Sequence, residues 1–121
     1  MTKKILIADD EQNIVISVEF LMKREGYAVS VAADGDEALA RIREEKPDLV
    51  LLDVMMPKKN GFEVCQEVRA DAALAGVRIL MLTARGRDTE VAKGLAIGAD
   101  AYMTKPFSTR DLVDKVRELL A

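Results

Sequence analysis

Leu49-Val50-Leu51-Leu52 is an uninterrupted apolar run that leads directly into Asp53. Runs of the same kind occur at residues 5–8 (Ile-Leu-Ile-Ala) and 79–82 (Ile-Leu-Met-Leu). Continuous runs of this length, rich in branched side chains, are typical of strands that are covered on both faces. Residues 28–32 and 101–103 form weaker runs that alternate or break early, so we expect edge strands there.

Helical patterns separate these runs. Apolar residues three or four positions apart recur at residues 12–25, 36–45, 61–70, 88–97 and 108–120. A glycine or proline follows the first two segments, and the last opens with the spacing of a capping box. Strand followed by helix, five times over, predicts an α/β fold, a doubly wound five-stranded parallel sheet with helices on both faces.

The composition limits the class of protein. The 121 residues fit one domain, 1–121, and a net charge of −3 gives no general attraction to nucleic acid or to anionic membranes. No apolar run approaches the roughly 20 residues of a membrane span, and no signal peptide is evident, so we expect a cytoplasmic protein. The absence of histidine excludes Ser-His-Asp and Cys-His catalysis, and the one cysteine, Cys65, is expected in the core.

Polar side chains stand directly after the first, third, fourth and fifth expected strands. They are Asp9, Asp10, Glu11, Asp53, Thr83, Thr104 and Lys105. Parallel sheets of this kind bind ligands at the carboxyl ends of their strands, where the strand order reverses. We therefore expect these residues, which come from four separate segments, to form one site.

The chemistry of such a site follows from its charges. Carboxylates gathered within a few ångströms repel one another, so a proton or a cation must join them. Mg²⁺ prefers oxygen ligands, keeps several waters and readily shares a phosphate. Lys105 adds a point charge suited to an oxyanion, and Thr83 adds a neutral donor. The pocket is thus predicted to accept a dianionic tetrahedral group beside Mg²⁺, with a carboxylate as the plausible nucleophile.

With these residues the chain resembles the CheY-like receiver domain of bacterial two-component response regulators. The resemblance spans essentially the whole chain and rests on five segments in order: Ile7–Glu11, Asp53–Pro57 with Asn60-Gly61, Leu82–Ala84, Gly98–Tyr102 and Thr104–Phe107. It implies a flavodoxin-like (βα)5 sheet with strand order 2-1-3-4-5.

The resemblance also implies roles at the site. Asp53 would be the phosphoacceptor, modified by a sensor histidine kinase or a phosphotransfer protein. Asp10 would bind Mg²⁺ directly and Asp9 through water, with Asp53 and the backbone carbonyl of Met55 as further ligands. The domain would catalyse only its own phosphorylation and dephosphorylation, so we do not expect an enzyme that acts on other substrates.

The resemblance further implies a conformational switch that depends on residues of the fourth and fifth expected strands. Lys105 would contact the phosphoryl oxygens, and its bond to Pro106 would be cis, as X-Pro chemistry permits. Thr83 would move toward the phosphoryl group and Tyr102 would turn inward, which couples the site to the surface of the fourth helix, fifth strand and fifth helix. The resemblance also implies that Met55 and Arg85 occupy positions that tune the lifetime of the phosphate. A bulky apolar Met55 cannot orient attacking water and Arg85 could shield the phosphoryl group, so we expect slow self-dephosphorylation.

Partners and output stay open. The surface of the fourth helix, fifth strand and fifth helix could support a phosphorylation-dependent homodimer, while no direct nucleic-acid binding and no membrane binding are expected of this domain. The residues that could form salt bridges across such a dimer are Lys93, Asp100, Asp111, Lys115 and Arg117. Kinase choice is expected to lie on the first helix, whose exposed residues include Asn13, Ser17 and Lys23. The chain could also be the receiver of a longer DNA-binding transcriptional regulator.

Two other classes of protein fit less well. A phosphatase of the haloacid dehalogenase type needs a second aspartate two residues after the nucleophile as general acid, and Met55 stands there. A flavodoxin-like electron carrier needs a hydroxyl- and glycine-rich phosphate loop and aromatic residues around the flavin. Here that loop is acidic and the aromatic content is only 4%.

Overall fold

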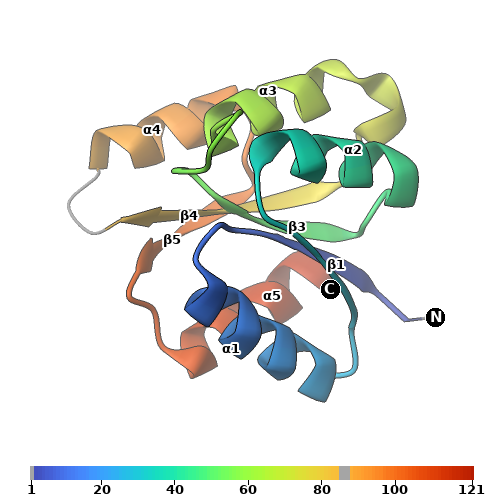
Figure 1. Ribbon diagram of the computed structural model, residues 1–121, viewed down its shortest axis with the longest axis vertical. Helices are drawn as coiled ribbons and strands as arrows, with labels where there is room; N and C mark the ends of the chain where they lie inside the picture. The colour runs from blue at the N-terminus through green and yellow to red at the C-terminus, as the bar shows by residue number, and fades with distance from the viewer. Residues whose placement is uncertain (1, 85–87) are drawn as a thin grey trace.

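The computed structural model describes residues 2–84 and 88–121 (Figure 1). Its strands are β1 (Lys4–Ala8), β2 (Ala28–Ala32), β3 (Leu49–Asp53), β4 (Arg78–Ala84) and β5 (Ala101–Lys105). Its helices are α1 (Gln12–Arg24), α2 (Gly35–Glu45), α3 (Gly61–Ala70), α4 (Asp88–Ile97) and α5 (Thr109–Leu120), with a 3-10 turn η1 (Ala72–Leu74) that was not predicted. None of these described helices is both long enough and apolar enough to cross a bilayer.

The strands form one parallel sheet in the order β2-β1-β3-β4-β5. Helices α2, α3 and α4 cover one face of the sheet, and α1 and α5 cover the other (Figure 1). The predicted doubly wound α/β fold is therefore confirmed, as are β2 and β5 as the edge strands. The strand order reverses between β1 and β3, which is where folds of this kind bind their ligands.

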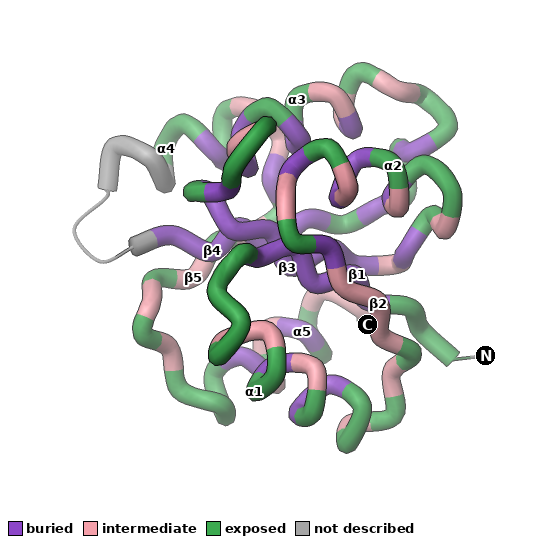
Figure 2. Tube along the Cα trace, viewed as in Figure 1, coloured by how far each residue is buried: buried purple, intermediate pink, exposed green. Residues whose placement is uncertain are grey.

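Each face of the sheet has its own core. In β1, Leu6 and Ala8 pack into the cluster beneath α2 and α3, whereas Ile5 and Ile7 pack into the cluster beneath α1 and α5. The same alternation runs through β3 and β4, so the centre of the sheet is buried on both sides (Figure 2). This explains why the three central strands are continuous apolar runs. Cys65 of α3 is also buried, as predicted.

Local signals set the ends of the helices. Gly26, just beyond α1, has a φ of +94°, a left-handed conformation that glycine adopts without steric cost. The Ser108 hydroxyl accepts a hydrogen bond from the Asp111 amide at 3.0 Å and caps α5. A complete capping box between Asn60 and Glu63 begins α3, which fixes the direction of the chain as it leaves the loop after β3.

The strands extend further than the sequence reading placed them. Asp53, Thr83 and Lys105 were expected directly after strands, but each lies inside the last part of its strand. The reason is that neighbouring strands continue to pair: Asp53 lies opposite Leu82, and Thr83 lies opposite Thr104. Because paired backbone is held by ladder hydrogen bonds, the sheet itself orients these side chains.

Candidate functional site

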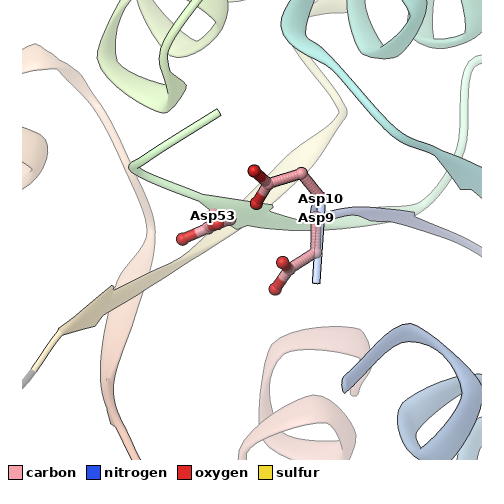
Figure 3. Close-up of side chains that lie close together, drawn as sticks. All are labelled: Asp9, Asp10 and Asp53. Atoms are coloured by element: carbon pink, nitrogen blue, oxygen red, sulfur yellow. The ribbon is translucent and has the colours of Figure 1, made fainter. Parts of the chain in front are cut away.

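Three aspartates meet at the carboxyl ends of β1 and β3. Asp9 and Asp10 follow β1, Asp53 is the last residue of β3, and the two strands are neighbours in the sheet. One carboxylate oxygen from each of the three lies within 4.8 Å of the others (Figure 3). Asp9 and Asp53 are buried, while Asp10 is exposed. The cluster predicted from the sequence therefore exists, with one member open to solvent.

Lys105 reaches this cluster from the far edge of the sheet. Its ammonium nitrogen lies 3.0 Å from Asp9 Oδ2, 3.1 Å from Glu11 Oε1 and 3.4 Å from Asp53 Oδ1. The lysine side chain is only 14% exposed, so these contacts are poorly screened by water. Three carboxylates thus share one ammonium, and the solvent-facing Asp10 adds a fourth nearby, so the cluster carries excess negative charge.

Burial and neighbouring charge shift the ionisation of the cluster. Removal from water, followed by repulsion from Asp9, raises the pKa of Asp53 to about 7, although Lys105 opposes the rise. Burial works against the charged form of Lys105, but its hydrogen bond to Asp9 and the charges of Asp53 and Asp9 outweigh burial and raise the pKa of Lys105. In the metal-free chain Asp53 is therefore partly protonated near neutral pH.

The donor set fits a hard divalent cation. Its members are carboxylate oxygens, the ligands that Mg²⁺ prefers, and their mutual repulsion is what a bound cation would relieve. The exposed Asp10 leaves one side of the cluster open to water, which Mg²⁺ keeps in its coordination shell. The three carboxylates could therefore hold a divalent cation.

Thr83 contributes a buried hydroxyl beside the cluster's strand. Its side chain is 1% exposed, and among residues 2–84 and 88–121 its Oγ1 has no hydrogen-bond partner. Burial of an unpaired hydroxyl costs stability, so such groups are uncommon in folded proteins. Thr83 lies one residue beyond the strand partner of Asp53, at the same end of the sheet.

Substitution of Thr83 with valine should raise the free energy of unfolding of the metal-free protein by about 1 kcal/mol, because it removes a buried hydroxyl that makes no hydrogen bond to any residue the structure describes. Valine has nearly the same shape and favours strands. Urea denaturation of the two proteins measures the difference. A loss of stability in the valine variant would mean that the hydroxyl does have a partner.

The other predicted site residues are placed by the structure only in part. Met55 follows Asp53 in the loop between β3 and α3, and its side chain is 58% exposed. Its amide lies 3.4 Å from Asp53 Oδ1. The bond between Lys105 and Pro106 is cis, as expected. Tyr102 lies on β5 with a partly exposed ring, and Arg85 falls outside the described residues.

Sequence reasoning missed several features at or near the site. The contact from Glu11 to Lys105 was not predicted, although Glu11 follows the two aspartates directly. Ile16 and Phe20 on α1 are 65% and 68% exposed, which is unusual for large apolar side chains. The signal was available, since both residues lie off the apolar stripe of that helix and are four positions apart, so they share one face.

Comparisons with known proteins show the family of the chain. Residues 5–117 match the family described as the response regulator receiver domain. The chain is 48% identical, over 120 residues, to the alkaline phosphatase synthesis transcriptional regulatory protein PhoP of Bacillus subtilis, covering 99% of this chain and 49% of that protein. The chain therefore spans about half the length of that curated relative.

Solved structures give the same result. The chain superposes with a TM-score of 0.94 on a putative response regulator from Chloroflexus aurantiacus, at 35% identity and with 99% and 98% of the two chains covered. It superposes with a TM-score of 0.93 on the chemotaxis response regulator CheY4 of Vibrio cholerae, at 34% identity and with 99% and 100% covered.

Proposed function

The chain belongs to the response regulator receiver domain family, and from this membership we propose that it is a switch controlled by phosphorylation of Asp53. The observation that carries the proposal is the geometry around this carboxylate. Asp53 is buried, its carboxylate lies in a cluster with those of Asp9 and Asp10, and the Lys105 ammonium lies 3.4 Å away. A nucleophile, a cation site and a positive group for an oxyanion are thus combined.

The proposed cofactor is Mg²⁺. Asp10, Asp53 and the Met55 carbonyl would hold it directly and Asp9 through water. When bound, it would neutralise charge on the carboxylates and on the phosphoryl oxygens.

In the transfer step, the bond from an Asp53 oxygen to phosphorus forms as the bond from phosphorus to the donor nitrogen breaks. The electron pair leaves with the imidazole of the donor phosphohistidine. The Lys105 ammonium exchanges its contacts with the carboxylates for contacts with the phosphoryl oxygens. The Thr83 hydroxyl donates a hydrogen bond to a phosphoryl oxygen. The chemistry is confined to this chain's own aspartate.

The proposed readout is the surface formed by α4, β5 and α5. Thr83 and Tyr102 would change position together once a dianion occupies the site, a local charge event with a distant effect. Several charged residues expected to bridge a dimer make contacts within the chain instead: Asp100 pairs with Arg69, Lys115 with Glu118, and Arg117 with Glu25. Formation of a dimer would require some of these pairs to be exchanged. Measuring the size of the protein in solution with and without phosphorylation would test whether this dimer forms.

The proposed partner is a sensor histidine kinase or a phosphotransfer protein that docks on α1. Two features support this: the exposed apolar pair Ile16 and Phe20, and an open groove between α1 and α5. Asn13 and Ser17, which were expected to face a kinase, line that groove together with Phe107. The cytoplasmic location predicted from the sequence is part of the same proposal.

A second proposal concerns the output. The similarity to a transcriptional regulatory protein, half of whose length the chain covers, favours a role as the receiver of a DNA-binding regulator. The coding sequence beyond Ala121 tests this proposal.

Incubation with a small phosphodonor and Mg²⁺ should add about 80 Da, one phosphoryl group, to the wild-type chain and nothing to an Asp53→Asn variant. Intact-mass spectrometry measures the change, and an Asp114→Asn variant, altered at an exposed carboxylate of α5, should behave as wild type. An added mass that persists in the Asp53 variant, or that resists acid and hydroxylamine, would rule out the proposal. The time course should show slow loss, because exposed, apolar Met55 cannot orient water. A lifetime of seconds would contradict that part.

A further inference from the structure

Residues 54–60, which we call the 54–60 loop, connect β3 to α3 and carry the Met55 carbonyl. A backbone hydrogen bond joins the residue after the loop to the first residue of the loop. The Gly61 amide donates to the Val54 carbonyl at 2.9 Å, and a Cβ on Gly61 would lie only 2.4 Å from the Asp53 carbonyl oxygen. Glycine is required there so that the loop can return to the strand it leaves.

The tip of the loop is held by a different part of the chain, the start of α2. The Gly35 amide donates to the Pro57 carbonyl at 3.2 Å. A Cβ on Gly35 would lie 1.9 Å from the Lys59 carbonyl oxygen and 2.5 Å from Lys59 Cβ, distances that real contacts never reach. Gly35 does not have a positive φ, so it is needed for space and not for an unusual conformation.

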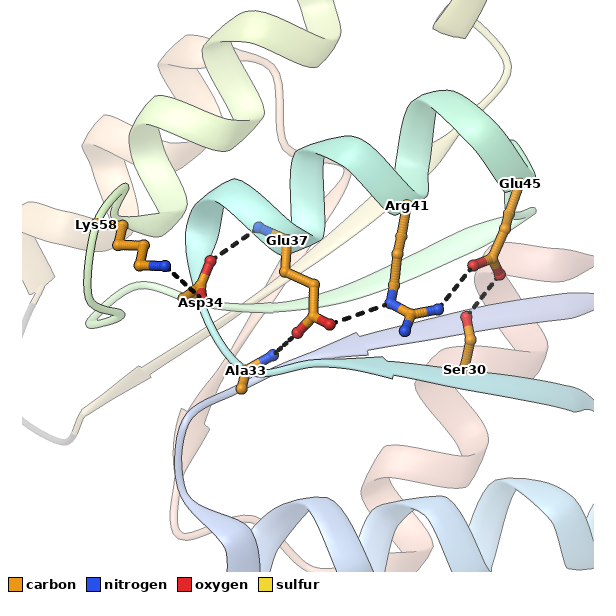
Figure 4. A network of polar contacts seen from close by, with 7 residues as sticks. All are labelled: Ser30, Ala33, Asp34, Glu37, Arg41, Glu45 and Lys58. Carbon is orange, nitrogen blue, oxygen red and sulfur yellow. Dashed lines mark hydrogen bonds and ion pairs between the residues drawn. The ribbon is translucent and has the colours of Figure 1, made fainter.

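A charged pair reinforces this contact. Asp34 caps α2 by accepting from the Glu37 amide at 2.8 Å, and its other carboxylate oxygen lies 3.5 Å from the Lys58 ammonium of the loop (Figure 4). The hydrogen bond from Glu37, followed by the charge of Lys58, holds the pKa of Asp34 below its usual value. Lys58 has a φ of +69°, which is uncommon for a residue with a side chain, so the loop adopts a defined conformation at this contact.

Further polar contacts run along α2 and tie its last residue, Glu45, to the edge of the sheet. Figure 4 shows them as a chain of side chains that runs from Glu37 and the Ala33 amide through Arg41 and Glu45 to Ser30 of β2. The start of α2 is therefore held on one side by the loop and on the other by the Ala33 amide, which follows β2.

We infer that Gly35 and Asp34 are positioning residues for the phosphoacceptor site, although α2 supplies no side chain to it. The start of α2 holds Pro57 of the 54–60 loop, two residues after Met55. Because the Met55 side chain is exposed, its packing does little to fix the position of the Met55 carbonyl. The affinity for Mg²⁺ then depends on the contact between α2 and the loop. This inference rests on the proposed function for the role of the Met55 carbonyl.

Gly35→Ala tests the inference against Gly76→Ala, a matched control at a glycine with no positive φ and with nothing within 4 Å of the added Cβ. Calorimetric titration with Mg²⁺ should show binding about tenfold weaker in Gly35→Ala, as expected when a group that orients a ligand is lost, and unchanged within about twofold in Gly76→Ala. Phosphorylation by a small phosphodonor should approach the wild-type rate at saturating Mg²⁺, since the defect is in affinity.

A second readout needs no metal. Amide hydrogen exchange across the 54–60 loop should be faster in metal-free Gly35→Ala than in wild type and in Gly76→Ala, while exchange in β1 and β3 should not change. If the wild-type chain binds no Mg²⁺, the proposed function fails, and the exchange result still decides whether α2 holds the loop. Equal Mg²⁺ affinity and equal loop exchange in the two glycine variants would overturn the inference.

If Gly35→Ala does not fold, Asp34→Ser replaces it. Serine keeps the cap of α2 but loses the pairing with Lys58. We expect Mg²⁺ binding weakened by about two- to threefold, a small effect because the Lys58 side chain is exposed. The control is Asp71→Ser, which changes an equivalent capping aspartate at the start of η1. Equal affinities in these two variants would contradict the role of Asp34.

Discussion

Replacement of Asp53 with asparagine should stabilise the metal-free protein by about 2 to 4 kcal/mol near pH 8. In the folded chain burial and the charge of Asp9 raise the pKa of Asp53 from 3.8 to about 7. Between these two values the folded chain binds a proton that the unfolded chain has released, so the free energy of unfolding falls as pH rises from about 4 to about 7. Asparagine does not ionise, and the variant escapes this loss.

Urea denaturation with chelator at pH 5, 6, 7 and 8 measures the effect. The stability difference between variant and wild type should increase over this series and level off above pH 7, where ionisation in the folded chain is nearly complete. Asp114→Asn, at an exposed carboxylate, should change stability by less than about 0.5 kcal/mol at every pH. A variant less stable than wild type at pH 8, or a difference independent of pH, would contradict the account of Asp53.

Added Mg²⁺ should reverse this difference in stability between Asp53→Asn and wild type. A cation that binds the folded chain stabilises it according to its concentration and affinity. Wild type should therefore gain stability as Mg²⁺ is added, whereas Asp53→Asn, with one proposed ligand weakened, should gain less. The same denaturation series with added Mg²⁺ checks this.

Substitution of Lys105 with methionine should destabilise the metal-free protein by about 3 kcal/mol at neutral pH. The change removes the ammonium that lies 3.0 Å from Asp9 and 3.4 Å from Asp53, and leaves both buried carboxylates uncompensated. The loss should be smaller at pH 5, because Asp53, whose pKa is raised to about 7, is then largely protonated. Lys23→Met, which breaks an exposed pair with Glu19, should cost less than about 0.5 kcal/mol.

A double variant separates the charge effect from packing. Asp53→Asn combined with Lys105→Met loses the attraction between the two groups only once, whereas each single variant loses it separately. The double variant should therefore be more stable than the sum of the single effects predicts, by about 1 to 3 kcal/mol. Additive effects would mean that the 3.4 Å contact between Lys105 and Asp53 contributes nothing.

Much of the fold could be predicted because its signals are local. The central strands are recognisable as continuous apolar runs since both faces of β1, β3 and β4 are buried. The boundaries of α3 and α4 were predicted correctly, and those of α1 and α2 to within one residue. The strand ends were wrong, because pairing between neighbouring strands carries Thr83 and Lys105 into the sheet, and pairing is not a local property.

The members of the site could be predicted because of topology. Polar residues at the ends of parallel strands must lie at one edge of the sheet, whichever strands they come from. The contact of Glu11 with Lys105 and the close approach of Gly35 to Lys59 could not be predicted this way. Both depend on where a loop or a long side chain lies after the sheet has formed.

The sequence by itself determined which chemical groups the site contains, because carboxylates, hydroxyl and ammonium are named by residue type and delivered by strand order. Only the tertiary structure decided how those groups behave. Ionisation depends on distance and on water, and both are set by packing between segments far apart in the chain: burial beside Asp9 raises the pKa of Asp53, and burial leaves the Thr83 hydroxyl without a partner among the described residues.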